Sequence, residues 1–192
     1  MIRIAVIGDI GSGKTHVSKK FNYPVFNADN EVSKLYKKNI KCFNKFKKIF
    51  PKYITKFPIE KKQLTKVILA NPSNLKKIVK IIHPEVQYCM NKFLKKNKKS
   101  KIVVLDIPLL LENKINKKGD ILIFVDANKN EINKRLKKRK NINMKLVKKL
   151  KKLQLPVETK KKKANFIIKN NFNNNFVKKS VKNILNNILS YD

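Results

Sequence analysis

The chain has 192 residues, of which 42% are hydrophobic, so it is long enough to bury a core and too apolar to be wholly disordered. It carries 48 Lys and Arg against 12 Asp and Glu, a formal net charge of +36. No apolar run approaches the ~18 residues of a membrane span, and Cys42 and Cys89 have no metal or redox spacing. We therefore expect a soluble, cytoplasmic, monomeric protein with two free thiols and no membrane partner.

The excess of lysine has two possible explanations. It could be an electrostatic footprint for nucleic acid or another polyanion. It could also be a compositional drift, which would explain the many asparagines in 170–175 as well, whereas selection for basicity would not. The lysines are scattered from Lys14 to Lys182 without a single stripe. We favour drift and expect no specific nucleic-acid partner, although anions are attracted in a salt-dependent way.

Short apolar runs alternate with helical patterns along the chain. The runs predict strands at 2–7, 25–26, 102–106, 121–125 and 166–168. Helical spacing predicts helices at 14–21, 129–153 (one or two) and 176–189, with several more between 30 and 97 punctuated by Pro51, Pro58, Pro72 and Pro84. The lysine run 160–163 is typical of a solvated loop. This alternation predicts an α/β fold with a parallel sheet covered on both faces.

The segment Gly8–Thr15 fits the pattern G-x-x-x-x-G-K-[ST] between a predicted strand and a predicted helix. Such a loop surrounds phosphate with backbone N–H groups and a helix N-terminus. Lys14 would reach the β- and γ-phosphates, and the Thr15 hydroxyl would ligate Mg²⁺. The loop predicts a nucleoside-triphosphate site without specifying the reaction. Asp9 should weaken binding there unless its side chain points outward or ligates Mg²⁺.

Two carboxylates and two arginines are candidates for the chemistry. Asp29 and Asp106 follow predicted strands, at the edge of a parallel sheet where ligands bind. One could accept a proton and the other could hold Mg²⁺, or either could be a turn or cap residue. Arg135 and Arg139 are spaced to share a helix face and could clamp a phosphoryl group, or could be ordinary surface residues.

Motifs outside the loop resemble those of the dephospho-CoA kinase family. Asp106–Glu112 matches that family's D-x-P-L-L-x-E in full, and Arg135–Arg139 matches its R-L-x-x-R. Asn27–Asp29 stands at its D-A-D, and Leu75–Pro84 stands at its L-x-x-I-x-H-P with one residue more. The late motif Q-x-P-x-E-x-K, followed by A-D and an Asn, corresponds to Gln154, Pro156, Glu158, Lys160, Ala164, Asn165 and Asn170.

This resemblance implies a P-loop NTPase fold with a five-stranded parallel sheet flanked by helices. The core would comprise 1–29, 98–128 and 161–192, with a helical substrate-binding insertion at about 30–97 and a lid at about 129–160. The implied reaction moves the γ-phosphoryl group of MgATP to the 3′-hydroxyl of the dephospho-CoA ribose, the final step of coenzyme A synthesis.

The resemblance also implies roles for individual residues. Asp29 would activate the acceptor hydroxyl, Lys14 would act on the phosphates, and Arg139, with Arg135 as a second candidate, would stabilise the transferring group. The implied ATP-binding residues are Gly11, Ser12, Gly13, Lys14, Thr15, His16, Arg135 and Arg139. The implied substrate-binding residues are Asp29, His83, Pro108 and Glu112, and the implied Mg²⁺ ligands are Thr15 and Asp106. On its own, His83-Pro84 is more typical of a turn at a helix end.

Several positions depart from the family pattern. Asp9 stands where the family has Gly, and Asn27 where it has the first Asp of D-A-D. Ser33, beside Lys34, stands in place of an Arg. Glu60-Lys61 stands in place of D-R, and Asn165 in place of a late Asp. Lys14, Thr15, Asp29 and Arg139 are kept, so we expect activity with weaker substrate affinity. Two alternatives stay open: another small-molecule kinase of the same fold, and a non-enzymatic polyanion- or RNA-binding protein descended from a kinase.

Overall fold

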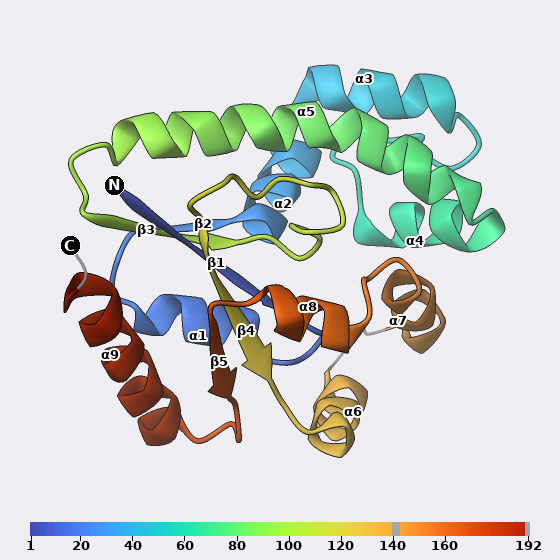
Figure 1. Cartoon of the computed structure of the whole chain (residues 1–192). Helices are drawn as coiled ribbons and strands as arrows, with labels where there is room; N and C mark the ends of the chain where they lie inside the picture. The colour runs from blue at the N-terminus through green and yellow to red at the C-terminus, as the bar shows by residue number, and fades with distance from the viewer. Residues whose placement is uncertain (140–142, 191–192) are drawn as a thin grey trace. The chain divides into compact units, whose positions relative to one another are not determined.

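The chain forms two compact units in this computed structural model, which describes residues 1–139 and 143–190. The first unit comprises Met1–Asn27 together with Asn97–Asp192, and the second comprises Ala28–Lys96. Figure 1 shows the elements of both. The second unit is thus inserted into the sequence of the first, between its second and third strands.

The first unit is built on a parallel sheet. Its strands are β1 (Ile2–Gly8), β2 (Val25–Asn27), β3 (Ile102–Asp106), β4 (Ile121–Asp126) and β5 (Phe166–Lys169). They lie in the order β2-β3-β1-β4-β5, and every pairing is parallel, which confirms the five-stranded parallel sheet expected from the sequence. The strand order changes direction at β1, so the crevice beyond the carboxyl end of β1 is where a ligand is expected.

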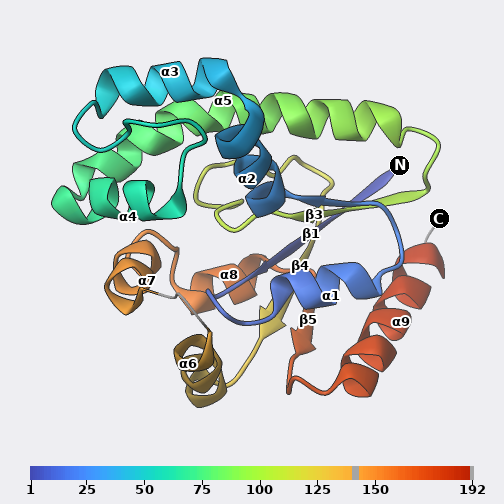
Figure 2. The same ribbon diagram turned by 180° about the vertical axis from the view of Figure 1, so that it is seen from behind.

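The described residues of the first unit form five helices, three of which cover the faces of this sheet. The five are α1 (Lys14–Lys20), α6 (Lys129–Lys138), α7 (Met144–Lys151), α8 (Val157–Lys163) and α9 (Asn174–Ser190). Figures 1 and 2 show α1 and α9 on one face of the sheet and α8 on the other. Alternate residues of the strands, such as Ile4 and Val6, pack against Val17 of α1 and Val181 of α9. Each such buried side chain contributes about 1.5–3 kcal/mol.

The prediction of a solvated loop at 160–163 is wrong. These residues belong to α8, and Lys160 is only 2% exposed. Lysine is a good helix former, and its long stem can lie along apolar surface while its ammonium group meets a carboxylate. Here Lys160 pairs with Glu112 and Lys161 pairs with Asp126. The run is therefore held in the unit by ion pairs.

The second unit is helical. It contains α2 (Ala28–Lys38), α3 (Ile40–Ile49), α4 (Lys61–Ala70) and α5 (Ser73–Lys96), and α5 packs against the other three. The ring of Phe46 meets those of Tyr36 and Phe50.

The interpretation of His83-Pro84 as a helix-end turn, and of Pro84 as a break between helices, is wrong. Pro84 lies inside α5. A proline inside a helix costs roughly 3 kcal/mol, because it removes one backbone hydrogen bond. The buried residues Ile78, Ile82 and Val86 continue the apolar face of α5 on both sides of Pro84 and offset that cost.

Two further observations bear on the expectations from composition. Both Cys42 and Cys89 carry free thiols. Burial raises the pKa of the Cys42 thiol to about 11, so this sulfur is unreactive near neutral pH. Within the described ranges, the search for a helix long and apolar enough to cross a membrane found none.

Candidate active site

The loop between β1 and α1 has the backbone of a phosphate cradle. Gly11 and Gly13 have φ angles of 87° and 93°, in the left-handed region that favours glycine. Ser12 between them is 1% exposed, with its hydroxyl oxygen buried. The Ser12 N–H donates to the Asp9 carbonyl at 3.1 Å, so the loop is closed by a turn of its own backbone.

Lys14 is the first residue of α1, so its charge adds to the positive end of that helix. Its Nζ donates to the carbonyl oxygens of Asp9 at 2.9 Å and of Gly8 at 3.3 Å. These bonds fold the side chain back along the loop. A phosphate oxygen is a stronger acceptor than a carbonyl, so a bound phosphate would draw the ammonium group to itself.

Thr15 meets Asp106 at the carboxyl end of β3. The Thr15 hydroxyl donates to Asp106 Oδ2 at 2.6 Å, and the Asn27 side-chain amide donates to the same oxygen. Asp106 is 2% exposed, and Asn27 lies directly beside it on β2. A hydroxyl and a carboxylate are oxygen ligands of the kind that Mg²⁺ prefers. Where the family pattern has a carboxylate, this chain thus places an amide that donates to Asp106.

The two arginines near the end of α6 have different settings. The Arg135 guanidinium carbon lies 4.2 Å from the centre of the Phe172 ring. Arg139 is the residue that ends the helix, with an extended backbone. The prediction that both share one helix face is therefore wrong, because α6 ends at Lys138. Both side chains are exposed.

Asp9 does not present an unpaired charge to the loop. Its Oδ1 accepts from the Ile10 N–H at 2.7 Å, and its Oδ2 lies 3.7 Å from Lys151 Nζ of α7. The next side chain, Ile10, packs against an apolar cluster of α6 and α7 that includes Leu136 and Val147. The loop tip is thus joined to these two helices by one ion pair and one apolar contact.

His16 follows Thr15 in the first turn of α1. Partial burial lowers the pKa of His16 below its ordinary value, and the positive charges of Lys20, Arg135 and Lys19 lower it further. The folded protein therefore binds this proton less tightly than the unfolded chain does. The contribution of His16 to stability is present above the pKa that this side chain has in the unfolded chain. It is lost as the pH falls below that value.

Binding of ATP should reverse this shift, because phosphate charge favours the imidazolium form. We expect proton uptake on MgATP binding, because His16 binds its proton more tightly in the complex than in the free protein. Calorimetry in two buffers of different ionisation enthalpy would measure it. His16→Asn should remove the uptake, whereas His83→Gln should retain it. Equal uptake by wild type and His16→Asn would contradict this role.

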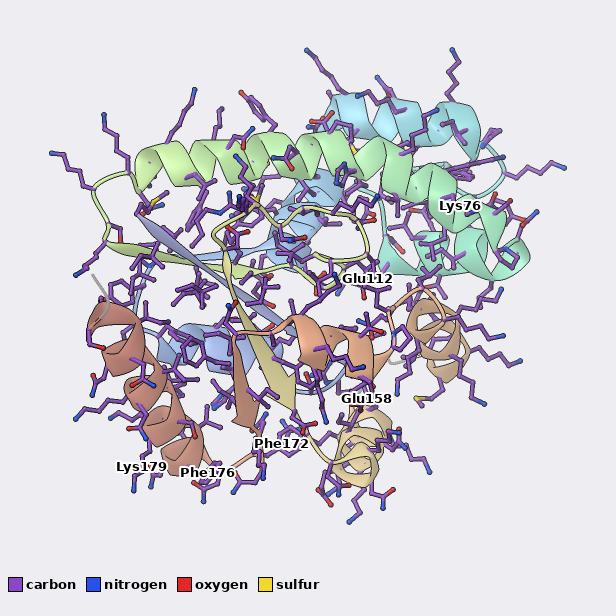
Figure 3. The ribbon with its side chains drawn as sticks, viewed as in Figure 1. Lys76, Glu112, Glu158, Phe172, Phe176 and Lys179 are labelled. Atoms are coloured by element: carbon purple, nitrogen blue, oxygen red, sulfur yellow. The ribbon has the colours of Figure 1, made fainter. Side chains whose placement is uncertain are left out.

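Glu112 and Lys160 form a buried ion pair. Lys160 Nζ lies 3.2 Å from Glu112 Oε1, with side chains 3% and 9% exposed. The same oxygen accepts from the Leu155 N–H at 2.9 Å. Figure 3 labels Glu112 and, on α8, Glu158. The pair joins the segment after β3 to α8. The Glu112 carboxylate, which is predicted to bind substrate, thus already has two partners, Lys160 and the Leu155 N–H.

Removal of the cation should destabilise the first unit. Lys160→Met would leave a buried carboxylate unpaired, at a cost of about 3–5 kcal/mol in the free energy of unfolding. Denaturant unfolding measures this cost, and Lys162→Met on the exposed side of α8 is the matched control. Adding Glu112→Gln to Lys160→Met should recover part of the loss. A change below about 1 kcal/mol for Lys160→Met would show that water, not Lys160, stabilises the carboxylate.

The other predicted substrate-binding residues lie on different elements of the structure. Pro108 lies in the turn after β3, two residues past Asp106. Asp29 lies in the first turn of α2, at the start of the second unit. His83 lies within α5, where its Nε2 is buried and accepts no hydrogen bond among the described residues. The substrate roles of Asp29, His83 and Pro108 stay predictions.

Three contacts of the site could not be predicted from the sequence. Asn170 and Lys160 belong to a recognised motif, but nothing in the pattern showed what they touch. Phe172 carried no signal at all, since a lone aromatic in an Asn-rich stretch is unremarkable in sequence. Their partners are more than thirty residues away in the chain, so only the fold brings them together.

Comparison with known proteins gives consistent results. The dephospho-CoA kinase family model matches residues 2–175. A dephospho-CoA kinase of Wolbachia pipientis wMel is 33% identical over 190 residues, which cover 96% of this chain and 97% of that protein.

Two solved structures share the fold. The protein TT1252 of Thermus thermophilus aligns with a TM-score of 0.80 at 24% identity, over 99% of this chain and 97% of that one. The dephospho-CoA kinase from Campylobacter jejuni aligns with a TM-score of 0.63 at 22% identity, over 98% of each chain.

The parallel sheet with its phosphate loop after the central strand, and the Thr15–Asp106 pair beside that loop, define the protein as a P-loop nucleotide-binding protein. Within that class, the family match over nearly the whole chain decides the assignment. The chain belongs to the dephospho-CoA kinase family, whose members are ATP-dependent kinases.

Proposed function

We propose that this chain transfers the γ-phosphoryl group of ATP to the 3′-hydroxyl of the dephospho-CoA ribose, giving ADP and coenzyme A. The observation that carries the proposal is the 2.6 Å hydrogen bond between Thr15 and Asp106. It joins the loop that any P-loop enzyme has to the first residue of the family-specific segment Asp106–Glu112. The free thiols of Cys42 and Cys89 support a cytoplasmic setting.

In this proposal, the first unit holds ATP. Backbone N–H groups of the loop and the α1 N-terminus surround the phosphates, and Lys14 neutralises charge on the β- and γ-phosphates. Thr15 and Asp106 would hold Mg²⁺, which supplies charge neutralisation between the phosphates when bound. Arg139, with Arg135, would stabilise charge on the transferring group.

Asp29 would receive the acceptor's proton. As the ribose oxygen forms its bond to the γ-phosphorus, the bond from that phosphorus to the β-phosphate oxygen breaks and ADP leaves. The proton of the 3′-hydroxyl passes to the Asp29 carboxylate. Because water would also accept the phosphoryl group, exclusion of water from the site is part of the catalytic requirement.

The experiment that tests this function measures ADP release from MgATP at near-physiological salt. ADP formed with dephospho-CoA, together with the product coenzyme A, is the expected result. Adenosine, AMP and shikimate serve as control acceptors. Turnover with one of these instead would assign a different kinase reaction, and the absence of turnover from folded, ATP-binding protein would overturn the proposal.

A further inference from the structure

Asn170 lies directly after β5 and connects three parts of the first unit. It is 4% exposed. Its Nδ2 donates to the Ser12 carbonyl at 2.8 Å, and its Oδ1 accepts from the Phe172 N–H at 2.9 Å. Its own backbone N–H donates to the Asp126 carbonyl at 2.6 Å. The side chain is thus fixed to the end of the sheet, and each of its polar atoms has a backbone partner.

The bond to Ser12 sets the direction of one peptide of the phosphate loop. In a planar trans peptide, the C=O and the following N–H point in opposite directions. Because Asn170 holds the Ser12 carbonyl, the N–H of Gly13 points away from Asn170. The fit is tight, since a Cβ added to Gly13 would collide with Asn170 Nδ2. A donor whose direction is fixed before the ligand arrives costs no reorganisation when charge develops.

The bond to Phe172 sets a second element of the site. Phe172 has a φ of 63°, a left-handed conformation that is uncommon for a bulky residue. The Asn170 side chain bridges to its N–H in the manner of an Asx turn. The Phe172 ring then lies under the Arg135 guanidinium, 4.2 Å from its centre to Cζ. Figure 3 shows Phe172 in the segment between β5 and α9.

We propose that Asn170 is a positioning residue for phosphoryl transfer. Its amide aims the Gly13 N–H at the nucleotide phosphates and, through Phe172, orients Arg135. The inference rests on the proposed function only in taking ATP as the bound nucleotide. The positioning role requires a side chain at position 170 that donates to one carbonyl and accepts from one amide at the same time. The amide of asparagine does both.

Asn170→Asp tests this requirement, because the two side chains have the same shape. An ionised carboxylate can still accept from Phe172 but faces the Ser12 carbonyl with an acceptor in place of a donor. A protonated carboxyl group can donate to that carbonyl again. Burial raises the pKa of a carboxyl group, so lowering the pH should restore the donor at this position.

We therefore expect the affinity of Asn170→Asp for MgATP to fall by about 10- to 100-fold relative to wild type at pH 8. The deficit should shrink as the pH is lowered and the carboxyl group is protonated. Asn170→Ala should show the deficit at every pH. In turnover, KM for ATP should rise and kcat fall, with KM for dephospho-CoA unchanged. Calorimetric binding of MgATP and steady-state kinetics on the full chain measure these quantities.

The ionisable groups around this position are Asp126, which pairs with Lys161 at 3.1 Å, Arg135 above Phe172, and Lys14 in the same loop. Partial burial lowers the pKa of His16, and expressing each affinity as a ratio to wild type at the same pH removes the effect of its titration.

Asn165→Asp is the matched control. Asn165 stands just before the other end of β5, where its Oδ1 accepts from the Leu122 N–H, also at 2.8 Å. This bond ties the sheet together and does not reach the loop, so the substitution should leave MgATP affinity and its pH profile unchanged. Thermal unfolding of all variants separates loss of stability from loss of binding.

The outcomes distinguish this inference from the proposed function. A pH-independent, wild-type affinity in Asn170→Asp would overturn the positioning role and leave the proposed reaction intact. Wild type that binds MgATP but makes no coenzyme A would overturn the proposed reaction and leave the positioning role testable by binding alone. If Asn170→Ala does not fold, the pH profile of Asn170→Asp decides the question.

Discussion

Lys14→Ala should lower kcat by about 1000-fold or more while the protein stays folded. Lys14 places its ammonium group across the loop, bonded to the carbonyls of Gly8 and Asp9. Phosphoryl transfer pushes negative charge onto the β–γ bridging oxygen, and the ammonium group, once drawn from these carbonyls to the phosphates, stabilises that charge. Removal of this cation leaves the developing charge to the backbone N–H groups, Mg²⁺ and the arginines. Steady-state turnover with MgATP and dephospho-CoA measures the loss.

The control for this experiment is Lys19→Ala. Lys19 lies on the same short helix α1, is exposed, and carries the same charge. It should keep near wild-type kcat, because it removes the charge from the helix but not from the loop. Far-ultraviolet circular dichroism and thermal unfolding should be similar for both variants. Retention of more than about a tenth of wild-type kcat by Lys14→Ala would contradict the role given to this residue.

Asp29→Asn should lower kcat by about 100- to 10,000-fold with little change in KM, since the acceptor hydroxyl would lose its general base. Asp29 lies in the first turn of α2, where the helix dipole favours a carboxylate. The asparagine keeps the shape of the side chain and loses the ability to take a proton. Its effect on stability should be at most about 1 kcal/mol. Turnover and substrate affinity should be measured on the same preparation.

Glu31→Gln provides the matched control for Asp29→Asn. Glu31 lies in the same first turn, and its substitution by Gln removes the same charge as Asp29→Asn. The Glu31 carboxylate is paired with Lys34 at 2.6 Å. Glu31→Gln should leave kcat within about twofold of wild type, as surface ion pairs of this kind contribute little. If both variants lost activity equally, charge near the helix N-terminus, and not proton transfer, would be the cause.

The high lysine content has more than one structural role. Most of the lysines in the described ranges are exposed, among them Lys76 and Lys179, which Figure 3 labels. A few are recruited: Lys160 and Lys161 anchor α8, and Lys151 meets Asp9. The preference for compositional drift over a nucleic-acid footprint stays a prediction. Binding of RNA that disappears at moderate salt would agree with it.

The strands and the phosphate loop were predictable because their signals are local. β-branched runs define β1, β3 and β4, and the glycines of the loop mark where the chain must take left-handed conformations. The rule that ligands bind at the carboxyl ends of parallel strands placed Asp106 near the loop, and the structure brings it to Thr15.

Errors arose where a local signal was outweighed by packing. Pro84 predicts a helix end, yet the apolar face of α5 continues through it. The lysine run 160–163 predicts solvent exposure, yet Glu112 draws Lys160 into the core. Arg139 was expected on a helix face from its spacing to Arg135, yet α6 ends one residue earlier. For Pro84 and Lys160 the deciding energy comes from packing or pairing partners that are distant in the chain.

The sequence by itself determined the class of fold, the nucleotide loop and the family, because these depend on periodicity and on motifs of adjacent residues. Only the tertiary structure decided how the motifs act on one another. The carbonyl of Ser12, the side chain of Asn170 and the guanidinium of Arg135 are joined through hydrogen bonds and ring contact across more than a hundred residues of sequence. Hydrogen bonds require distances near 2.9 Å and defined angles, and no pattern along a chain specifies such geometry until the sheet has brought its strand ends together.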